Sequence, residues 1–147
     1  MDLTESLRAY LDQHVSAFQN IEVIGEGTAF HYTPHGKNIR KSGGFLGAPI
    51  NPNLAATQDG PISTRATDPD GVVFAYLQQE TAVAEGRGPE MELFEIRFRR
   101  AISAIQVNDA EMHVGIGRQP VPQILVVASE ILGFESRGLV EDYYPKI

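Results

Sequence analysis

The chain has 147 residues, the length of one globular domain. Its hydrophobic fraction of 42% and charged fraction of 21% are those of a folded protein and argue against disorder. It contains no cysteine, which excludes disulfides, thiol catalysis and thiolate metal sites. Nineteen acidic residues against twelve basic ones give a net charge of −7, which disfavours nucleic-acid binding unless the basic residues gather on one face.

The N-terminal segment lacks the features of a targeting sequence. It reads MDLTESLRAYLDQ, begins with an acidic residue and contains no apolar core of the kind that a signal peptide has. No stretch of the sequence approaches the roughly 18 consecutive apolar residues of a membrane-spanning helix. We therefore predict a single domain over residues 1–147 that is cytoplasmic and makes no membrane contact.

Residues 1–19 are predicted to hold an amphipathic N-terminal helix, spanning residues 3–19. Its apolar side chains recur at spacings of four and three and so share one helix face: Leu3, Leu7, Leu11, Val15 and Phe18. Asp2 or Thr4 can cap its start. We expect this helix to pack on the rest of the domain.

Two strands and a short helix follow. Residues 21–24 begin an extended stretch, and residues 28–33 are rich in aromatic and β-branched side chains, which favours a strand. Residues 37–42 predict a short helix, which the pair Gly43 and Gly44 can end.

A long segment without apolar periodicity comes next. Residues 45–61 read FLGAPINPNLAATQDGP and are rich in proline. Loops of this length are uncommon in compact domains unless they bind, cover a site or are disordered. We predict a lid-like loop over a ligand, followed by a short strand at residues 62–64.

The second half alternates strands with short connections. Residues 71–77 form an apolar run that predicts a buried strand, and residues 79–85 predict a short helix. Residues 90–99 alternate, with Phe94, Ile96 and Phe98 on one face, as in a half-buried strand. Residues 101–107 are predicted to continue or pair with that strand. Residues 121–128 predict a central strand and residues 129–134 a turn.

Several common site motifs are absent. The four histidines form no HxxxH or HExxH pattern, and His31 and His35 flank Pro34, where no helix can present them together, so we predict no metal site. The segment GEGTAF at residues 25–30 is not a dinucleotide fingerprint, because it lacks the third glycine and leads into a strand. There is no P-loop and no GxSxG elbow.

The order of the remaining motifs resembles the ADP-ribosyltransferase superfamily, in particular its small bacterial and phage-type members and its diphtheria-toxin-like branch. A strand carries His31-Tyr32-Thr33, residues 38–43 read NIRKSG like the family's short helix, and residues 71–76 read GVVFAY like its second strand. The resemblance covers residues 27–128. It implies an α+β fold with a split β-sheet core, here with an N-terminal helix and the lid-like loop.

The resemblance also implies an NAD site. In that family the first-strand histidine hydrogen-bonds the nicotinamide-side ribose and its neighbours hold the nicotinamide amide, which assigns NAD binding to His31, Tyr32 and Thr33. His31 is expected to act as a donor. Aromatic side chains of the second strand stack on the nicotinamide, a role that falls to Phe74 and Tyr76.

Arg40, in the basic group at residues 37–41, can bind the NAD diphosphate.

The catalytic glutamate of many members opens a late strand in a context like E-[VI]-L-V. Here Gln123 stands in that place, in PQILV at residues 122–126. A glutamine can hydrogen-bond a ribose hydroxyl but supplies no negative charge. Glu111, Glu95 or Glu130 could substitute, and Gln123 and Glu111 are the candidate catalytic residues.

These residues predict an NAD-dependent mono-ADP-ribosyltransferase, with NAD as its substrate and no metal, that modifies a macromolecular target. Breaking the nicotinamide–ribose bond passes through an oxocarbenium-like transition state, which needs ring stacking, a ribose contact and usually a carboxylate. Small size and acidity suit a toxin, an effector or a phage-encoded modifier, acting in the cytosol of a host, with a protein rather than a nucleic acid as target.

Other readings are open. The chain can be a catalytically inactive binding or inhibitor protein of the same fold, acting through its loops and N-terminal helix, with His31 a structural histidine and Phe74 and Tyr76 part of the core. NAD-dependent removal of a 2′-phosphate from RNA is the weakest reading, because that chemistry needs a basic site.

Overall fold

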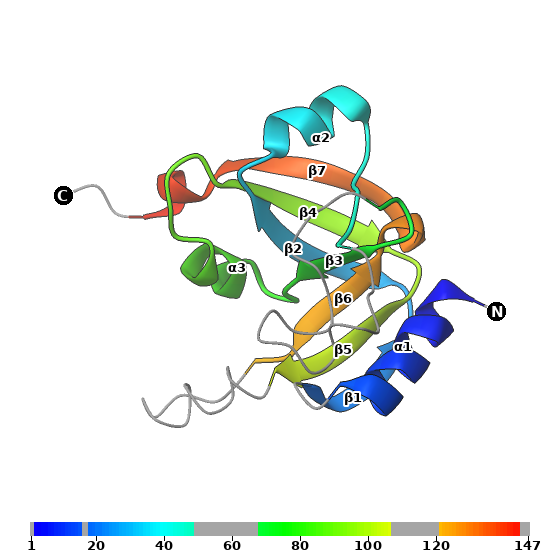
Figure 1. Ribbon diagram of the computed structural model, residues 1–147. Coiled ribbons are helices and arrows are strands. Elements are labelled where there is room, and N and C mark those ends of the chain that lie inside the picture. The colour runs from blue at the N-terminus through cyan, green and yellow to red at the C-terminus, as the bar shows by residue number, and fades with distance from the viewer. Residues whose placement is uncertain (1, 16–17, 49–67, 107–120, 145–147) are drawn as a thin grey trace.

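The computed structural model describes residues 2–15, 18–48, 68–106 and 121–144. These residues form an α+β fold with three α-helices and two antiparallel sheets (Figure 1). The helices are α1 (Leu3–His14), α2 (Gly36–Ser42) and α3 (Gln79–Glu85), with the short 3₁₀ helices η2 (Ala128–Glu130) and η3 (Val140–Tyr143). The predicted α+β class is confirmed.

The strands divide between a four-stranded and a three-stranded sheet, and all pairings are antiparallel. The first sheet has the order β1 (Phe18–Ile24), β5 (Ala101–Gln106), β6 (Gln123–Val127), β3 (Val72–Ala75). The second has the order β2 (Gly27–Thr33), β4 (Glu92–Phe98), β7 (Ile131–Leu139). β3 is thus an edge strand of one sheet and β2 an edge strand of the other.

The two sheets share one apolar core. Phe94, Ile96 and Phe98 of β4 are completely buried and pack with side chains of β3 and β6 from the other sheet. Arg97, between them in sequence, is exposed. The alternation predicted for residues 90–99 is therefore confirmed.

α1 packs on the outer face of the four-stranded sheet (Figure 1), where Leu7 and Leu11 are completely buried. The carboxylate of Asp2 caps the helix by accepting a hydrogen bond from the Thr4 backbone N–H at 2.8 Å. The predicted end at residue 19 is wrong, since the helix ends at His14. Phe18 already belongs to β1 but packs in the same cluster as the helix, which is why the apolar spacing runs past the end of α1.

The two short helices occur where the sequence predicts them. Gly43 adopts a left-handed backbone with φ of 78° after α2, and its N–H donates to the Ile39 carbonyl at 2.8 Å. Such a backbone is strained for residues with a Cβ, so the glycine ends the helix there. α3 spans the predicted residues 79–85 and packs on the outer side of β2.

Two predictions for the second half are wrong. Residues 129–134, expected to turn, form η2 and the start of β7, which pairs along β4. β7 is mostly exposed and contains Gly133 and Gly138, so it lacks the apolar alternation that marks a buried strand. β5 neither continues nor pairs with β4; it lies between β1 and β6 in the other sheet.

Most of the predicted lid-like loop lies outside the described residues, as does the predicted strand at residues 62–64. Its first part is described, and there Gly47 bridges to Asp68 and Ala48 to Val72, both antiparallel. No helix among the described residues is long and apolar enough to cross a membrane.

Candidate functional site

The two sheets meet at the edges of β2 and β3. The Phe30 N–H donates to the Tyr76 carbonyl at 2.6 Å, and the Tyr76 N–H donates to the Phe30 carbonyl at 2.8 Å. This pair of main-chain bonds joins the middle of β2 to the residue that follows β3. It therefore brings residues of the two predicted NAD-binding strands to one place, at the junction of the sheets.

His31 lies at this junction on the inner side of β2, opposite Phe94 in the β2–β4 register. Its Nδ1 lies 2.5 Å from the Phe74 carbonyl oxygen of β3. A carbonyl only accepts hydrogen bonds, so Nδ1 carries the proton and Nε2 of the neutral ring is an acceptor. The Phe45 ring meets the imidazole edge-on, with ring centroids 5.5 Å apart.

Burial lowers the pKa of His31, and the hydrogen bond to the Phe74 carbonyl opposes this only in part. The imidazole is therefore neutral at pH 7. A ribose hydroxyl would have to donate to Nε2, so the donor role expected for His31 becomes an acceptor role.

Gln123 and Tyr76 come together on the neighbouring strands. Gln123 is the first residue of β6, the place that the resemblance assigns to the catalytic glutamate. Its Nε2 makes a long hydrogen bond of 3.5 Å to the Tyr76 hydroxyl oxygen. Its Oε1 is buried and has no hydrogen-bond partner among the residues that the structure describes. A buried amide oxygen left in this state is an available acceptor for a ligand hydroxyl or N–H.

The ring of Tyr32 stacks against that of His31, with centroids 6.5 Å apart and an interplanar angle of 14°, whereas the ring of Phe74 lies elsewhere. Tyr32 follows His31 on β2 and packs in the cluster beneath α3, where burial and the charge of Glu85 raise the pKa of its hydroxyl. The ring of Phe74 packs in the cluster under α1, on the outer face of the four-stranded sheet. Phe74 contributes its carbonyl oxygen to the junction, whereas its ring, predicted to stack on the nicotinamide, packs in that cluster.

Thr33 is buried at the end of β2, and its hydroxyl accepts a hydrogen bond from the His35 backbone N–H at 3.1 Å. This bond shapes the turn into α2, which is a structural role.

Arg40 of α2 is half exposed and forms an ion pair with the buried Glu92 of β4. Glu92 also accepts a hydrogen bond from the Ser136 hydroxyl at 2.6 Å. Burial acts to raise the pKa of Glu92, but the hydrogen bonds from Arg40 and Ser136 and the Arg40 charge hold it below its ordinary value. The same hydrogen bond raises the pKa of Arg40. A diphosphate would compete with Glu92 for the Arg40 guanidinium, while Lys37 and Lys41 on α2 are exposed.

Two of the substitute carboxylates are engaged elsewhere. Glu95 forms an ion pair with Arg137, and Glu130 is buried and accepts two hydrogen bonds of 2.9 Å from Arg99. Neither contacts His31. Glu111 lies outside the described residues. Gln123 is thus the one candidate for the glutamate position that the described residues place at the junction.

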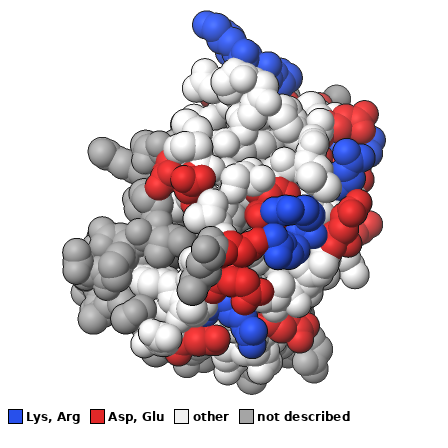
Figure 2. Space-filling view, turned by 90° about the vertical axis from the view of Figure 1, so that its right-hand side faces the viewer, with Lys and Arg blue, Asp and Glu red and all other residues white. Residues whose placement is uncertain are grey.

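The basic residues do not form a patch on the face shown in Figure 2. Acidic and basic side chains lie next to one another there, and basic side chains also project over α2 at the top of the view. Arg100 illustrates the pairing, because it forms an ion pair with Asp2 and lies 3.8 Å from Glu130.

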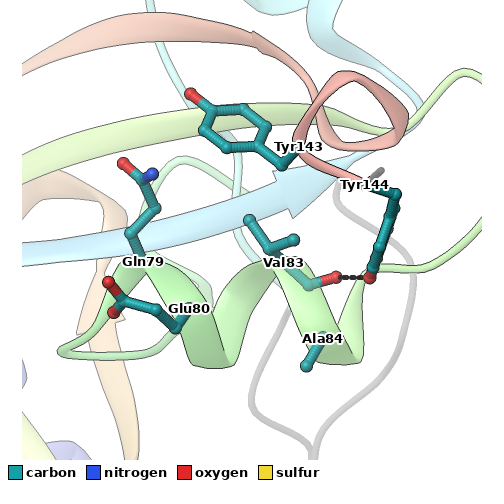
Figure 3. A pocket seen from close by; sticks show the side chains of 6 residues that line it. All are labelled: Gln79, Glu80, Val83, Ala84, Tyr143 and Tyr144. Atoms are coloured by element: carbon teal, nitrogen blue, oxygen red, sulfur yellow. Dashed lines mark hydrogen bonds between the residues drawn. The ribbon is translucent and has the colours of Figure 1, made fainter. Parts of the chain in front are cut away.

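A groove between α3 and η3 was not predicted from the sequence. It has a volume of about 230 Å³, and its walls are Gln79, Glu80, Val83, Ala84, Tyr143 and Tyr144 (Figure 3). The C-terminal segment has no apolar period, and the only hint in the sequence is a tyrosine pair that follows two acidic residues. None of the predicted NAD-binding residues lines this groove.

Among the described residues, no three histidine, aspartate or glutamate side chains lie close enough together to hold a metal ion. Comparisons of the chain with protein-family models, with curated proteins and with solved structures gave no match.

Proposed function

We propose that this chain is an NAD-dependent mono-ADP-ribosyltransferase of the superfamily that its motifs resemble, acting on a protein in the cytoplasm of the cell that makes or receives it. The observation that carries the proposal is the β2–β3 junction, where His31 of β2 bonds the Phe74 carbonyl of β3 and Gln123 of β6 bonds the hydroxyl of Tyr76, the residue after β3. The division of the strands into two antiparallel sheets with β2 and β3 at the facing edges supports it as well.

The groups at the junction suit the ground state of NAD. The Tyr76 ring can stack on the nicotinamide, the neutral His31 can accept from a ribose hydroxyl, and the orphan Oε1 of Gln123 can accept from a second hydroxyl or from the nicotinamide amide. A bound ligand would satisfy a buried oxygen that the described part of the chain leaves unpaired.

In the proposed reaction the nicotinamide–ribose bond breaks and its electron pair leaves with nicotinamide. A nucleophilic side chain of the target then forms the new bond to the ribose carbon and loses a proton. The positive charge that develops on the ribose is best stabilised by a carboxylate. Gln123 offers only the partial charge of an amide oxygen, so this chain should turn over slowly unless an acidic residue outside the described part of the chain contributes.

Calorimetric titration with NAD tests the binding. Wild-type protein should bind saturably, and His31→Ala should bind at least tenfold more weakly, because it loses a contact to the ribose. His35→Ala is the matched control, since His35 is exposed on the following turn. Thermal unfolding of each variant separates lost binding from lost folding. No binding to wild type at millimolar NAD would remove the NAD-dependent function altogether.

Gln123→Glu tests the chemistry, with nicotinamide release as the readout. A carboxylate at this place should raise NAD turnover roughly 100- to 1,000-fold, the order of effect seen for one electrostatic contact in an active site. Gln123→Ala should bind NAD more weakly and release no nicotinamide. An unchanged rate in Gln123→Glu would contradict the assigned position.

A second candidate is a binding protein of the same fold without turnover. The engagement of Glu95 and Glu130 by arginines favours it, together with the amide at residue 123. It predicts that wild type binds NAD and releases no nicotinamide with any target present, whereas Gln123→Glu releases nicotinamide. A wild-type chain that modifies a target protein would exclude this candidate.

A further inference from the structure

The groove between α3 and η3 is lined mainly by apolar and aromatic surface. Tyr143 and Tyr144 extend from η3 over α3, which supplies the other four lining residues (Figure 3). The Tyr144 hydroxyl donates to the Val83 carbonyl, and the Tyr143 hydroxyl donates to the Arg137 carbonyl at 2.7 Å. Both tyrosines are thus held at their tips, and the groove keeps its shape without a ligand.

The size of the groove limits what can enter. Its volume of about 230 Å³ lies below the roughly 300–1,000 Å³ of pockets that hold drug-sized ligands. A dinucleotide is therefore excluded here, whereas a single amino-acid side chain fits. The groove is distinct from the β2–β3 junction, since the lining residues and the junction residues do not overlap.

The charges around the groove are mixed, with four acidic residues on its two helices and the arginines Arg87 and Arg137 next to its two tyrosines. α3 carries Glu80 and Glu85, η3 carries Glu141 and Asp142, and neither helix contains a lysine or arginine. Glu80 forms part of the groove wall, is exposed, and takes part in no ion pair within the described chain. Figure 3 shows Glu80 on the Tyr143 side of the groove, away from Tyr144, so a cationic group stacked on Tyr143 would have this carboxylate available at that end.

The protein itself contains one contact between an arginine guanidinium and a tyrosine ring. The guanidinium carbon of Arg87 lies 4.2 Å from the ring centroid of Tyr144, stacked on that ring. A guanidinium is planar and weakly hydrated, so it stacks on tyrosine and forms paired hydrogen bonds with a carboxylate more readily than an ammonium does.

We propose that the α3–η3 groove binds an arginine side chain of a partner protein, stacked on Tyr143 and paired with Glu80. Tyr143 is 40% exposed, so its ring is accessible to a partner. The groove lies beside the junction, because Val83 and Tyr144 belong to the same apolar cluster as Tyr76. A partner anchored there would be held next to the proposed NAD site.

Titration followed by amide chemical shifts tests this inference without NAD, so its result is independent of the proposed transfer. The probe is N-acetyl-arginine methylamide, and N-acetyl-citrulline methylamide is the matched neutral control. The arginine probe should shift the amides of α3 and η3 saturably, with a dissociation constant in the millimolar range. The citrulline probe should bind several-fold more weakly. No saturable shift, or equal binding of both probes, would overturn the inference.

Two glutamine variants locate the contact. Glu80→Gln should weaken the binding of the arginine probe roughly two- to five-fold, which is the effect of losing one exposed ion pair. Glu85→Gln removes the same charge from the same helix outside the groove and should leave the affinity within experimental error of wild type. Equal losses in the two variants would mean that the probe responds to the overall charge of α3, and the groove assignment would be wrong.

Discussion

Two polar sites in this fold differ in how completely their hydrogen-bonding atoms are used. At the start of β4, both carboxylate oxygens of the buried Glu92 are engaged, one by Arg40 and the other by Ser136. At the start of β6, Gln123 makes one long bond, and its buried Oε1 has no partner within the described ranges of the chain. A saturated network stabilises the fold, whereas an unsatisfied buried group costs free energy that a ligand can recover. The comparison separates a structural site from a candidate binding site.

The largest expected effect is at the saturated site. Glu92→Ala should lower the free energy of unfolding by about 2 kcal/mol, because hydrogen bonds to a charged group contribute roughly 1.5–3 kcal/mol. Urea denaturation measures it. Arg40→Gln, which keeps the Ser136 hydrogen bond, should destabilise the protein less than Glu92→Ala does, since Arg40 is half exposed. Equal losses in the two variants would contradict a role for Ser136.

Lowering the pH should destabilise the protein in two separate ranges, one caused by His31 and the other by Glu92. The pKa of His31 is lowered by folding, so the unfolded chain binds more protons and stability falls as the pH drops below about 6.5. The pKa of Glu92 is also lowered, so a second loss begins below about 4.3. In urea denaturation across pH, His31→Gln should flatten the first range and Glu92→Gln the second. A first range that persists in His31→Gln would show that another group causes it.

The smallest change in the free energy of unfolding is expected at Gln123, and there it should be an increase. Gln123→Leu removes the orphan oxygen and should raise the free energy of unfolding by up to about 1 kcal/mol, since an unpaired buried polar group costs roughly 1–3 kcal/mol. The same variant should bind NAD more weakly in calorimetry. If Gln123→Leu destabilised the fold as much as Glu92→Ala, Gln123 would belong with the structural residues.

Local patterns in the sequence predict much of this fold. α3 spans the predicted residues 79–85, β2 nearly matches residues 28–33, and the alternation in β4 places its aromatic residues in the core. β7 was missed because it is a partly exposed edge strand whose partner, β4, is distant in the sequence. β7 is stabilised by its pairing with β4, and a short stretch of sequence around β7 does not reveal that pairing.

The sequence predicts which residues belong to the candidate site, but not how they are arranged in space. Gln123 opens β6 as expected, but its contact with Tyr76 depends on how β3 and β6 pair. That Glu95 and Glu130 would be taken by arginines also depends on tertiary contacts. The α3–η3 groove is the extreme case, since its two walls are far apart in sequence and neither shows a pattern by itself.

The placement of β7 has a consequence for the order in which the protein can assemble during synthesis. β4 leaves the ribosome with β2 on one side and an open edge on the other, and only the last part of the chain closes that edge. Open strand edges pair readily with other chains. A nascent or truncated protein that ends after β6 would contain His31, Tyr76 and Gln123 yet lack a finished sheet beneath them. Such a fragment should aggregate, and the junction should become competent only after the C-terminal strand has docked.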